Sequence, residues 1–169
     1  IANGGYKISP KIIVNNKPLN FQEAKKNMEL ASSTDPNLQL IKDEKNLRIV
    51  QKAMFSSTNE IRGTSYRSRI DDPKYQFAGK TGTAQVKRIS KRERELDLKI
   101  EQIPYNDRDH ALYVAYGPYV NPRYAISIIV EHGGSGSKAA APMAKELFKL
   151  IIDRDGLREK QSNFEEIDI

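Results

Sequence analysis

Apolar residues in the second half of the chain predict a small sheet. The segments 110–117 and 123–131 are rich in β-branched and aromatic residues, and the five residues between them suit a hairpin connection. A further strand is expected over 76–87, which runs from Phe77 through a polar stretch to Val86. Because consecutive strands joined by short connections pair in opposite directions, we expect the sheet to be antiparallel.

Apolar residues spaced three or four apart predict two helices. The first covers 43–58, with Asp43 as its N-cap and an apolar stripe of Leu47, Val50, Ala53 and Met54. The second follows the glycine-rich segment 133–137 and has Pro142 in its first turn. Its buried face is expected to comprise Met143, Ala144, Leu147, Phe148 and Ile151.

The remaining segments are less regular. In residues 1–14 a glycine turn precedes two apolar clusters, which are interpreted as a strand pair, while 15–40 predict a loop with one short helix near 21–31. The tail 153–169 is charged and is expected to fray. The order of elements predicts an α+β fold, with an antiparallel sheet packed by helices, in which 1–152 form one domain portion.

Composition narrows the possible functions. At 169 residues with 38% hydrophobic content, the chain is long enough to bury a core. It has no cysteine, which excludes disulfides, thiolate zinc sites and a cysteine nucleophile. The net charge of +6 has no nucleic-acid recognition motif beside it, so we expect no nucleic-acid partner. The charge-rich segment 88–108 is interpreted as an inserted loop or short helix exposed to solvent.

No metal or organic cofactor is predicted. The only histidines, His110 and His132, fall at strand ends with no second ligand nearby in the sequence, and structural or surface roles are favoured. Four tyrosines are interpreted as packing residues rather than as a stacking platform: Tyr113, Tyr116, Tyr119 and Tyr124. No apolar run is long enough to span a bilayer, and the sequence starts at Ile1 without a signal peptide. We therefore expect a piece of a longer protein.

The candidate chemistry lies in Lys80-Thr81-Gly82-Thr83, inside the strand predicted over 76–87. A strand edge offers backbone groups to an extended peptide, and Gly82 lets an acyl substrate lie against the backbone. The Thr83 N–H would form half of an oxyanion hole. The hydroxyls of Thr81 and Thr83 would bind a carboxylate, and Lys80 would supply positive charge or assist proton transfer. A solvent-facing strand with a glycine bulge explains the same four residues.

The motif resembles the third motif of penicillin-binding proteins and serine β-lactamases, whose set is Ser-x-x-Lys, Ser-x-Asn and Lys-Thr-Gly. The downstream segments 108–124 and 130–142, and the opening 1–6, are similar to the penicillin-binding protein 2 family. That family comprises the class B, elongation-specific peptidoglycan D,D-transpeptidases. The resemblance covers nearly the whole chain, is strongest over 75–145, and is weak over 15–45.

The resemblance implies part of a penicillin-binding, serine β-lactamase-like transpeptidase fold and a role for each motif residue. Lys80 would be the catalytic lysine near the hydroxyl of the middle motif. Thr81 and Thr83 would hold the carboxylate of a stem peptide or a β-lactam. The Thr83 amide would complete the oxyanion hole. Gly82 has no side chain and would leave room for the substrate along the strand.

The resemblance also implies partners and a location. The partners would be peptidoglycan stem peptides, β-lactam antibiotics, the glycan polymerase of the elongation complex, and the upstream half of the same transpeptidase domain. The parent enzyme would work at the periplasmic face of the bacterial inner membrane, in cell-wall elongation and cell-shape maintenance. It would be held there by an N-terminal helix outside this chain.

The nucleophile that this chemistry requires is not found in the sequence. Ser135-x-x-Lys138 has the right spacing, but it follows Lys80 in chain order and lies in a glycine-rich loop, so it is rejected. Ser57-x-Asn59 fits the middle motif, but it lies at a predicted helix end and is interpreted as a cap and turn. Without the serine no covalent intermediate forms, and we expect the chain alone to be inactive.

Two other functions compete with this interpretation. The segment 133–139 resembles a phosphate-binding loop, but Ala139 follows Lys138 where that motif needs Ser or Thr. Alternatively, the chain is a non-catalytic interaction module, or a remnant that needs a separate chain carrying the serine. In that case the segment 88–108 and the charged tail would be contact surfaces.

Overall fold

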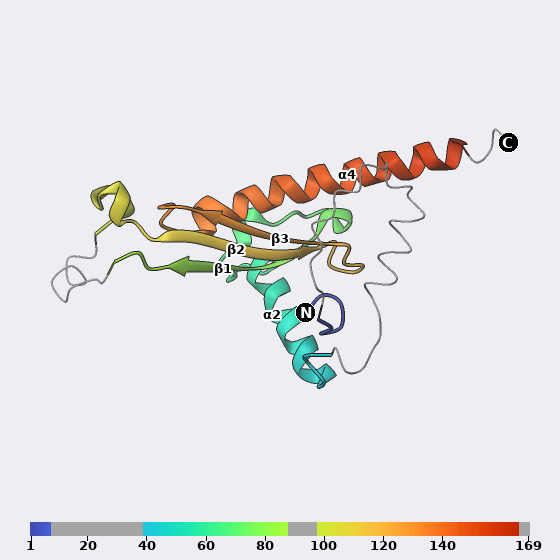
Figure 1. Ribbon diagram of the computed structural model, residues 1–169, viewed down its shortest axis with the longest axis horizontal. Helices are drawn as coiled ribbons and strands as arrows, with labels where there is room; N and C mark the ends of the chain where they lie inside the picture. The colour runs from blue at the N-terminus through green and yellow to red at the C-terminus, as the bar shows by residue number, and fades with distance from the viewer. Residues whose placement is uncertain (8–38, 88–97, 166–169) are drawn as a thin grey trace. The chain divides into compact units, whose positions relative to one another are not determined.

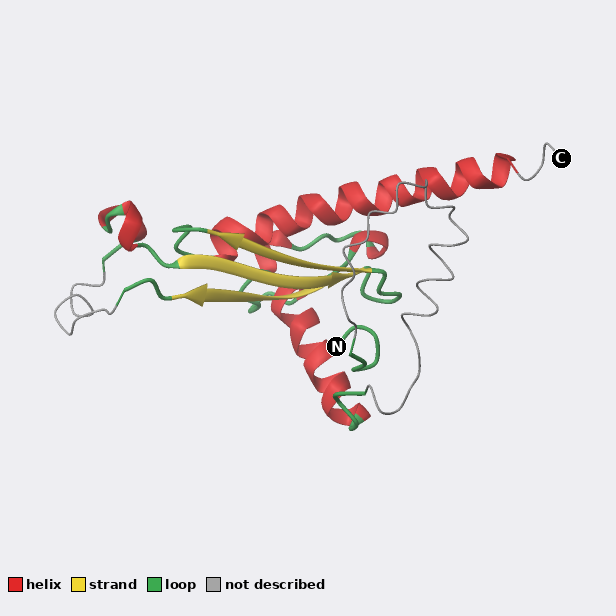
Figure 2. Ribbon diagram, viewed as in Figure 1, coloured by secondary structure: helices red, strands yellow, loops and turns green. Residues whose placement is uncertain are grey.

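The computed structural model describes residues 1–7, 39–87 and 98–165, with the side chains of the last helix described to residue 156. The chain divides into two compact units, Ile1–Lys52 and Ala53–Ile169. Figure 1 shows the elements, and Figure 2 shows them by type. The candidate motif lies in the second unit.

In the first unit, Tyr6 forms an isolated antiparallel bridge with Gln39, and the Leu40 amide donates to the Gly5 carbonyl at 2.8 Å. Only the first residues of the predicted strand pair are described, and there Tyr6 pairs with Gln39, which belongs to the segment predicted as a loop. The rest of that pair and the short helix predicted near 21–31 lie in 8–38, outside the described residues.

Helix α2, Glu44–Asn59, confirms the helix predicted over 43–58. Asp43 caps it as predicted, because its carboxylate accepts the Lys45 amide at 2.8 Å. The predicted apolar stripe is wrong in part. Leu47 is buried, whereas Val50 is 40% exposed and Ala53 is exposed, since none of the described residues covers that side of the helix.

The second unit is built on an antiparallel sheet in the order β1-β2-β3, as predicted. The strands are β1, Ala78–Ala84, β2, His110–Gly117, and β3, Tyr124–Val130. Cross-strand partners share a face of the sheet. Thr81 is opposite Tyr113, and Gly82 is opposite Leu112.

One face of the sheet is covered by described residues, and the other is exposed except at the buried cross-strand pair of Ala78 and Tyr116. Ala111, Tyr113 and Ala115 alternate along β2 and are at most 4% exposed. They pack with residues of the π-helical turn η6, Gly136–Ala140, and of helix α4, Ala141–Glu165. On the opposite face, Val114 is 47% exposed and Ile129 is 63% exposed. The first face therefore carries the core.

The buried face of α4 differs from the predicted one. Phe148 and Ala144 are fully buried as expected, but Met143 is 51% exposed and Leu147 is 39% exposed. The buried residues recur at three- and four-residue spacing on a narrower stripe: Ala141, Ala144, Phe148 and Ile152. Small alanines let the start of the helix approach the sheet closely, and this places the larger Met143 on the outer side.

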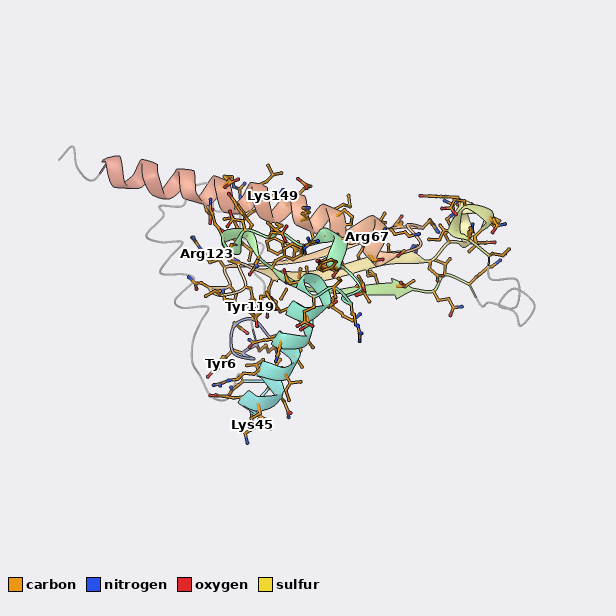
Figure 3. The ribbon with its side chains drawn as sticks, turned by 180° about the vertical axis from the view of Figure 1, so that it is seen from behind. Tyr6, Lys45, Arg67, Tyr119, Arg123 and Lys149 are labelled. Carbon is orange, nitrogen blue, oxygen red and sulfur yellow. The ribbon has the colours of Figure 1, made fainter. Side chains whose placement is uncertain are left out.

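Helix α4 continues through Asp153 to Glu165, past the start of the tail predicted over 153–169. Asp153 accepts hydrogen bonds from the Tyr75 hydroxyl and the Lys74 ammonium, and these lower the pKa of its carboxyl. Arg123, which Figure 3 labels, pairs with Asp155 at 3.3 Å. These partners hold the helix beyond the predicted boundary.

The described part of the predicted insert, residues 98–108, contains two short 3-10 helices, η4, Ile100–Gln102, and η5, Tyr105–Asp107. The rest of the insert, 88–97, lies outside the described residues. The Lys87 ammonium contacts the Asp107 carboxylate at 2.8 Å, which ties the end of the insert to the chain just after β1.

Candidate functional site

The motif Lys80–Thr83 lies within β1, which is an edge strand of the sheet formed by the described residues. Lys80 and Thr83 are exposed, while Thr81 and Gly82 are partly buried. A Cβ added at Gly82 would lie 3.1 Å from the Leu112 Cβ, on the open face of the sheet. The four predicted site residues therefore lie together on an accessible strand, as the substrate-binding hypothesis requires.

Polar contacts surround the motif. The Lys80 ammonium donates to the Thr81 carbonyl at 2.8 Å and lies 3.4 Å from the Thr81 Oγ1. The Thr81 hydroxyl lies 3.1 Å from the Thr64 hydroxyl, which in turn lies 3.1 Å from the Ser57 hydroxyl. A line of three hydroxyls thus runs from the end of α2 to β1.

The Ser57-x-Asn59 segment ends α2, which agrees with its interpretation as a cap and turn. Asn59 also has a task that the sequence did not reveal. Its side-chain amide donates to the Phe55 carbonyl at 3.0 Å and to the Phe77 carbonyl at 2.9 Å. Because Phe77 directly precedes β1, this amide fixes the start of the motif strand to the helix end.

Three buried hydroxyls meet beneath β1. The Tyr113 hydroxyl contacts Thr58 at 2.9 Å and Ser65 at 3.1 Å, and the latter two lie 3.3 Å apart. Burial raises the pKa of Tyr113, and the bonds to Ser65 and Thr58 offset part of that effect. A Cβ at Gly79 would lie 2.3 Å from the Tyr113 hydroxyl, so only glycine fits there. These contacts fix the position of β1 relative to the end of α2.

Tyr116 and Tyr119 pack against other side chains as predicted, but one of their hydroxyls has no hydrogen-bond partner among the described residues. The Tyr119 ring packs against Phe55 in a tilted arrangement, with ring centroids 4.2 Å apart, and Tyr119 lies on the connection between β2 and β3 (Figure 3). Tyr116 is 4% exposed, and its hydroxyl has no hydrogen-bond partner among the described residues. Burial raises the pKa of Tyr116 to about 12, so this phenol stays neutral.

The rejected Ser135-x-x-Lys138 segment lies against β1, but on the covered face. The Ser135 hydroxyl contacts the Ser137 hydroxyl at 3.0 Å, while Lys138 is exposed. A Cβ added at Gly136 would lie 2.5 Å from the Leu112 carbonyl oxygen and 2.7 Å from that of Gly82. The segment therefore packs directly against the backbone of the motif strand on the covered face.

Replacing Gly136 with alanine should strain this contact, because the new methyl group would meet backbone atoms that cannot rotate away. We expect Gly136→Ala in the full-length protein to cost about 1–3 kcal/mol, the range for overpacking. Scanning calorimetry would measure this as a lower melting temperature. Gly156→Ala is the matched control: nothing lies within 4 Å of its added Cβ, and alanine favours a helix by up to about 1 kcal/mol. Equal effects of the two substitutions would contradict the close contact at Gly136.

The two histidines contact each other, which the sequence did not indicate. The His132 amide donates to His110 Nδ1 at 2.9 Å, and the rings are 4.8 Å apart. His132 Nδ1 also lies 3.1 Å from the Arg108 carbonyl oxygen. These contacts join the end of β3 to the start of β2. Within the described ranges, no group of three or more potential metal-ligating side chains gathers.

Comparison with known proteins identifies the family. The family model of the penicillin-binding protein transpeptidase domain matches residues 1–149. The chain belongs to this family. Its antiparallel sheet and helices are therefore part of a transpeptidase fold, and the resemblance noted in the sequence is confirmed.

Two of the matching proteins are named peptidoglycan D,D-transpeptidase MrdA. This transpeptidase chain is 37% identical over 105 residues to the peptidoglycan D,D-transpeptidase MrdA of Salmonella typhimurium, covering 62% of this chain and 16% of that protein. It is 46% identical over 81 residues to the protein of the same name from Acinetobacter baumannii, covering 47% of this chain and 11% of that protein. The chain thus spans about a sixth of the length of such relatives, or less.

A solved structure shows the same fold. Pseudomonas aeruginosa PBP2 in complex with WCK 5153 is 32% identical, with a TM-score of 0.50, over 66% of this chain and 20% of that chain. Among the helices that the structure describes, none combines the length and the apolar character needed to cross a membrane.

Proposed function

We propose that this chain supplies the Lys-Thr-Gly-Thr strand of a peptidoglycan D,D-transpeptidase of the penicillin-binding protein 2 type. Such an enzyme cross-links stem peptides by serine acyl transfer during cell-wall elongation and is acylated by β-lactams. The observation that carries the proposal is an accessible edge strand bearing Lys80, Thr81 and Thr83 in a chain of the transpeptidase family.

The edge position suits an extended acyl peptide, which would add to the sheet along β1. In an antiparallel strand, one residue's N–H and C=O point to the same side, and residues two apart share that side. The Thr81 carbonyl accepts the Lys80 ammonium. This alternation supports a Thr83 N–H on the same side, available to the developing oxyanion.

The side chains of the motif complement an acyl substrate that carries a carboxylate. Thr81 and Thr83 each offer a hydroxyl donor, and the exposed Lys80 ammonium adds positive charge beside them. In the complete site, Lys80 would assist proton transfer near the hydroxyl of the middle motif. The nucleophilic serine would come from the upstream half of the domain.

The open face of the sheet fits this division of the domain. Lys80 and Gly82 lie on that face with the exposed apolar side chains of Val114 and Ile129. We expect the upstream half to cover Val114 and Ile129, because exposed apolar side chains that gather on one face commonly mark a contact surface. The parent enzyme would be anchored at the periplasmic face of the inner membrane and would work beside the glycan polymerase of the elongation complex.

Fluorescent penicillin tests the proposal directly. The longer protein, in which a Ser-x-x-Lys segment precedes this chain, should give a labelled band on a denaturing gel. The 169-residue chain alone should give none, because the serine that forms the acyl bond is supplied from upstream. Excess unlabelled penicillin should abolish the band.

Two outcomes would count against the proposal. A labelled band from the chain alone would contradict the assignment of the serine to the upstream half. An unlabelled longer protein would contradict the transpeptidase function itself. Mixing the chain with its upstream half provides a further check, since recovered labelling would show that the two halves form one site.

A further inference from the structure

We propose that Thr64 is a positioning residue that directs the Thr81 hydroxyl toward the carboxylate of the acyl substrate, with Ser57 behind it. The inference rests on the proposed function, since it needs a carboxylate at Thr81. It assigns a role to the loop between α2 and η2, the 3-10 helix Tyr66–Ser68.

The geometry links three hydroxyl groups from separate parts of the second unit. Ser57 lies in the last turn of α2, Thr64 in the following loop, and Thr81 in β1. The Oγ atoms of Ser57 and Thr64 are 3.1 Å apart, as are those of Thr64 and Thr81. The line ends at Thr81, whose hydroxyl also lies 3.4 Å from the Lys80 ammonium.

Thr64 is held in place by both of its neighbours. A Cβ at Gly63 would lie 2.3 Å from the Ser57 carbonyl oxygen and 2.5 Å from that of Ser56, so the loop packs directly on the helix end. The Ser65 amide and hydroxyl each donate to the Ser57 carbonyl at 3.0 Å. The Thr64 side chain therefore projects toward β1 from a fixed backbone, although it is exposed.

Hydroxyl chemistry gives the line a direction. A hydroxyl donates one hydrogen bond and accepts two. For Thr81 to donate its proton to a carboxylate, it must accept from Thr64 rather than donate to it. Thr64 then accepts from Ser57, and Lys80 donates to the second lone pair of Thr81. Bonds aligned in one direction polarise one another, which strengthens the final donor.

The consequence is a dependence on the substrate carboxylate that a purely structural residue would lack. In the full-length enzyme, Thr64→Val keeps the shape and removes the hydroxyl. We expect acylation by a penicillin to slow by about 3- to 10-fold, the range for one hydrogen bond. Acylation by the same penicillin esterified at its carboxylate should change much less. The ester is neutral, so its hydrogen bond from Thr81 lacks the charge assistance that a carboxylate provides.

Three further variants test whether Thr64 acts through Thr81. Thr64→Ser restores the hydroxyl and should restore the rate. Ser57→Ala should cause a smaller loss with the same dependence on the carboxylate. In a Thr81→Val background, Thr64→Val should cause no further loss, which a double-mutant cycle would measure. Melting temperatures of all variants would show that they remain folded.

The outcomes separate this inference from the proposed function. If the wild-type enzyme reacts with neither penicillin, the proposed function fails and the positioning role fails with it. If the wild type reacts and Thr64→Val matches it with the free acid, the positioning role alone is wrong. The positioning role is equally wrong if Thr64→Val slows the reactions of the acid and the ester to the same extent. Should Thr64→Val not fold, Ser57→Ala carries the same test.

Discussion

Lys80→Ala in the full-length enzyme is expected to slow acylation by penicillin by about two to four orders of magnitude, the range for losing one proton-transfer or oxyanion element. Lys80 carries an exposed ammonium on the motif strand, 3.4 Å from the Thr81 hydroxyl. In the proposed site, alanine would remove both the positive charge beside the substrate carboxylate and the group that assists proton transfer. Stopped-flow or gel-based labelling with fluorescent penicillin would give the rate.

Lys138→Ala is the matched control for this experiment. Lys138 is also an exposed lysine near β1, and it belongs to the rejected Ser135-x-x-Lys138 segment on the covered face. We expect its removal to leave the acylation rate as it is in the wild type. A Lys80→Ala enzyme as fast as wild type would refute the role of Lys80, and a slow Lys138→Ala enzyme would reopen the rejected motif.

Phe148→Ala should give the largest loss of stability. Phe148 is fully buried, and its ring stacks on that of Phe77 with centroids 4.8 Å apart. Truncation would leave a cavity between α4 and the sheet and should cost about 3–5 kcal/mol. A destabilisation of about 1 kcal/mol lowers the melting temperature of a domain of about 150–250 residues by about 2–4 °C, so we expect a fall of roughly 6–20 °C.

The control for Phe148→Ala lies on the same helix. Glu146 is exposed on α4, and Glu146→Ala replaces one good helix former with another, so stability should change by less than about 0.5 kcal/mol. Calorimetry on the full-length protein would compare the two variants. A Phe148→Ala protein that melts with the Glu146→Ala protein would mean that α4 does not pack on the sheet as described.

The strands could be predicted because their signals are local. β2 has the predicted bounds, and β3 begins and ends within one residue of the prediction, since the hairpin joins two apolar runs. The motif could be found because a lysine, two threonines and a glycine have a recognisable order. The buried face of α4 was harder: large residues such as Met143 were expected inside, but the alanines determine how closely the helix approaches the sheet.

The supports of the site could not be predicted, because small polar residues leave no periodic signal. Thr58 meets Tyr113 across 55 positions of sequence, and Asn59 meets Phe77 across 18. Nothing in the local pattern distinguishes these residues from an ordinary helix end. Thr64 is equally plain in the sequence, and only the fold brings its hydroxyl to Thr81.

The open border of β1 faces two conflicting demands. Under the proposed function it leaves backbone groups free for a peptide, but an edge strand can also pair with another copy of the same strand, the first step toward aggregation. A charged side chain on an edge strand discourages that pairing, and Lys80 is an exposed charge within β1. Besides its proposed role in catalysis, Lys80 should therefore oppose the pairing of β1 with another copy of itself. Lys80→Ala preparations should self-associate more readily than wild type at equal concentration.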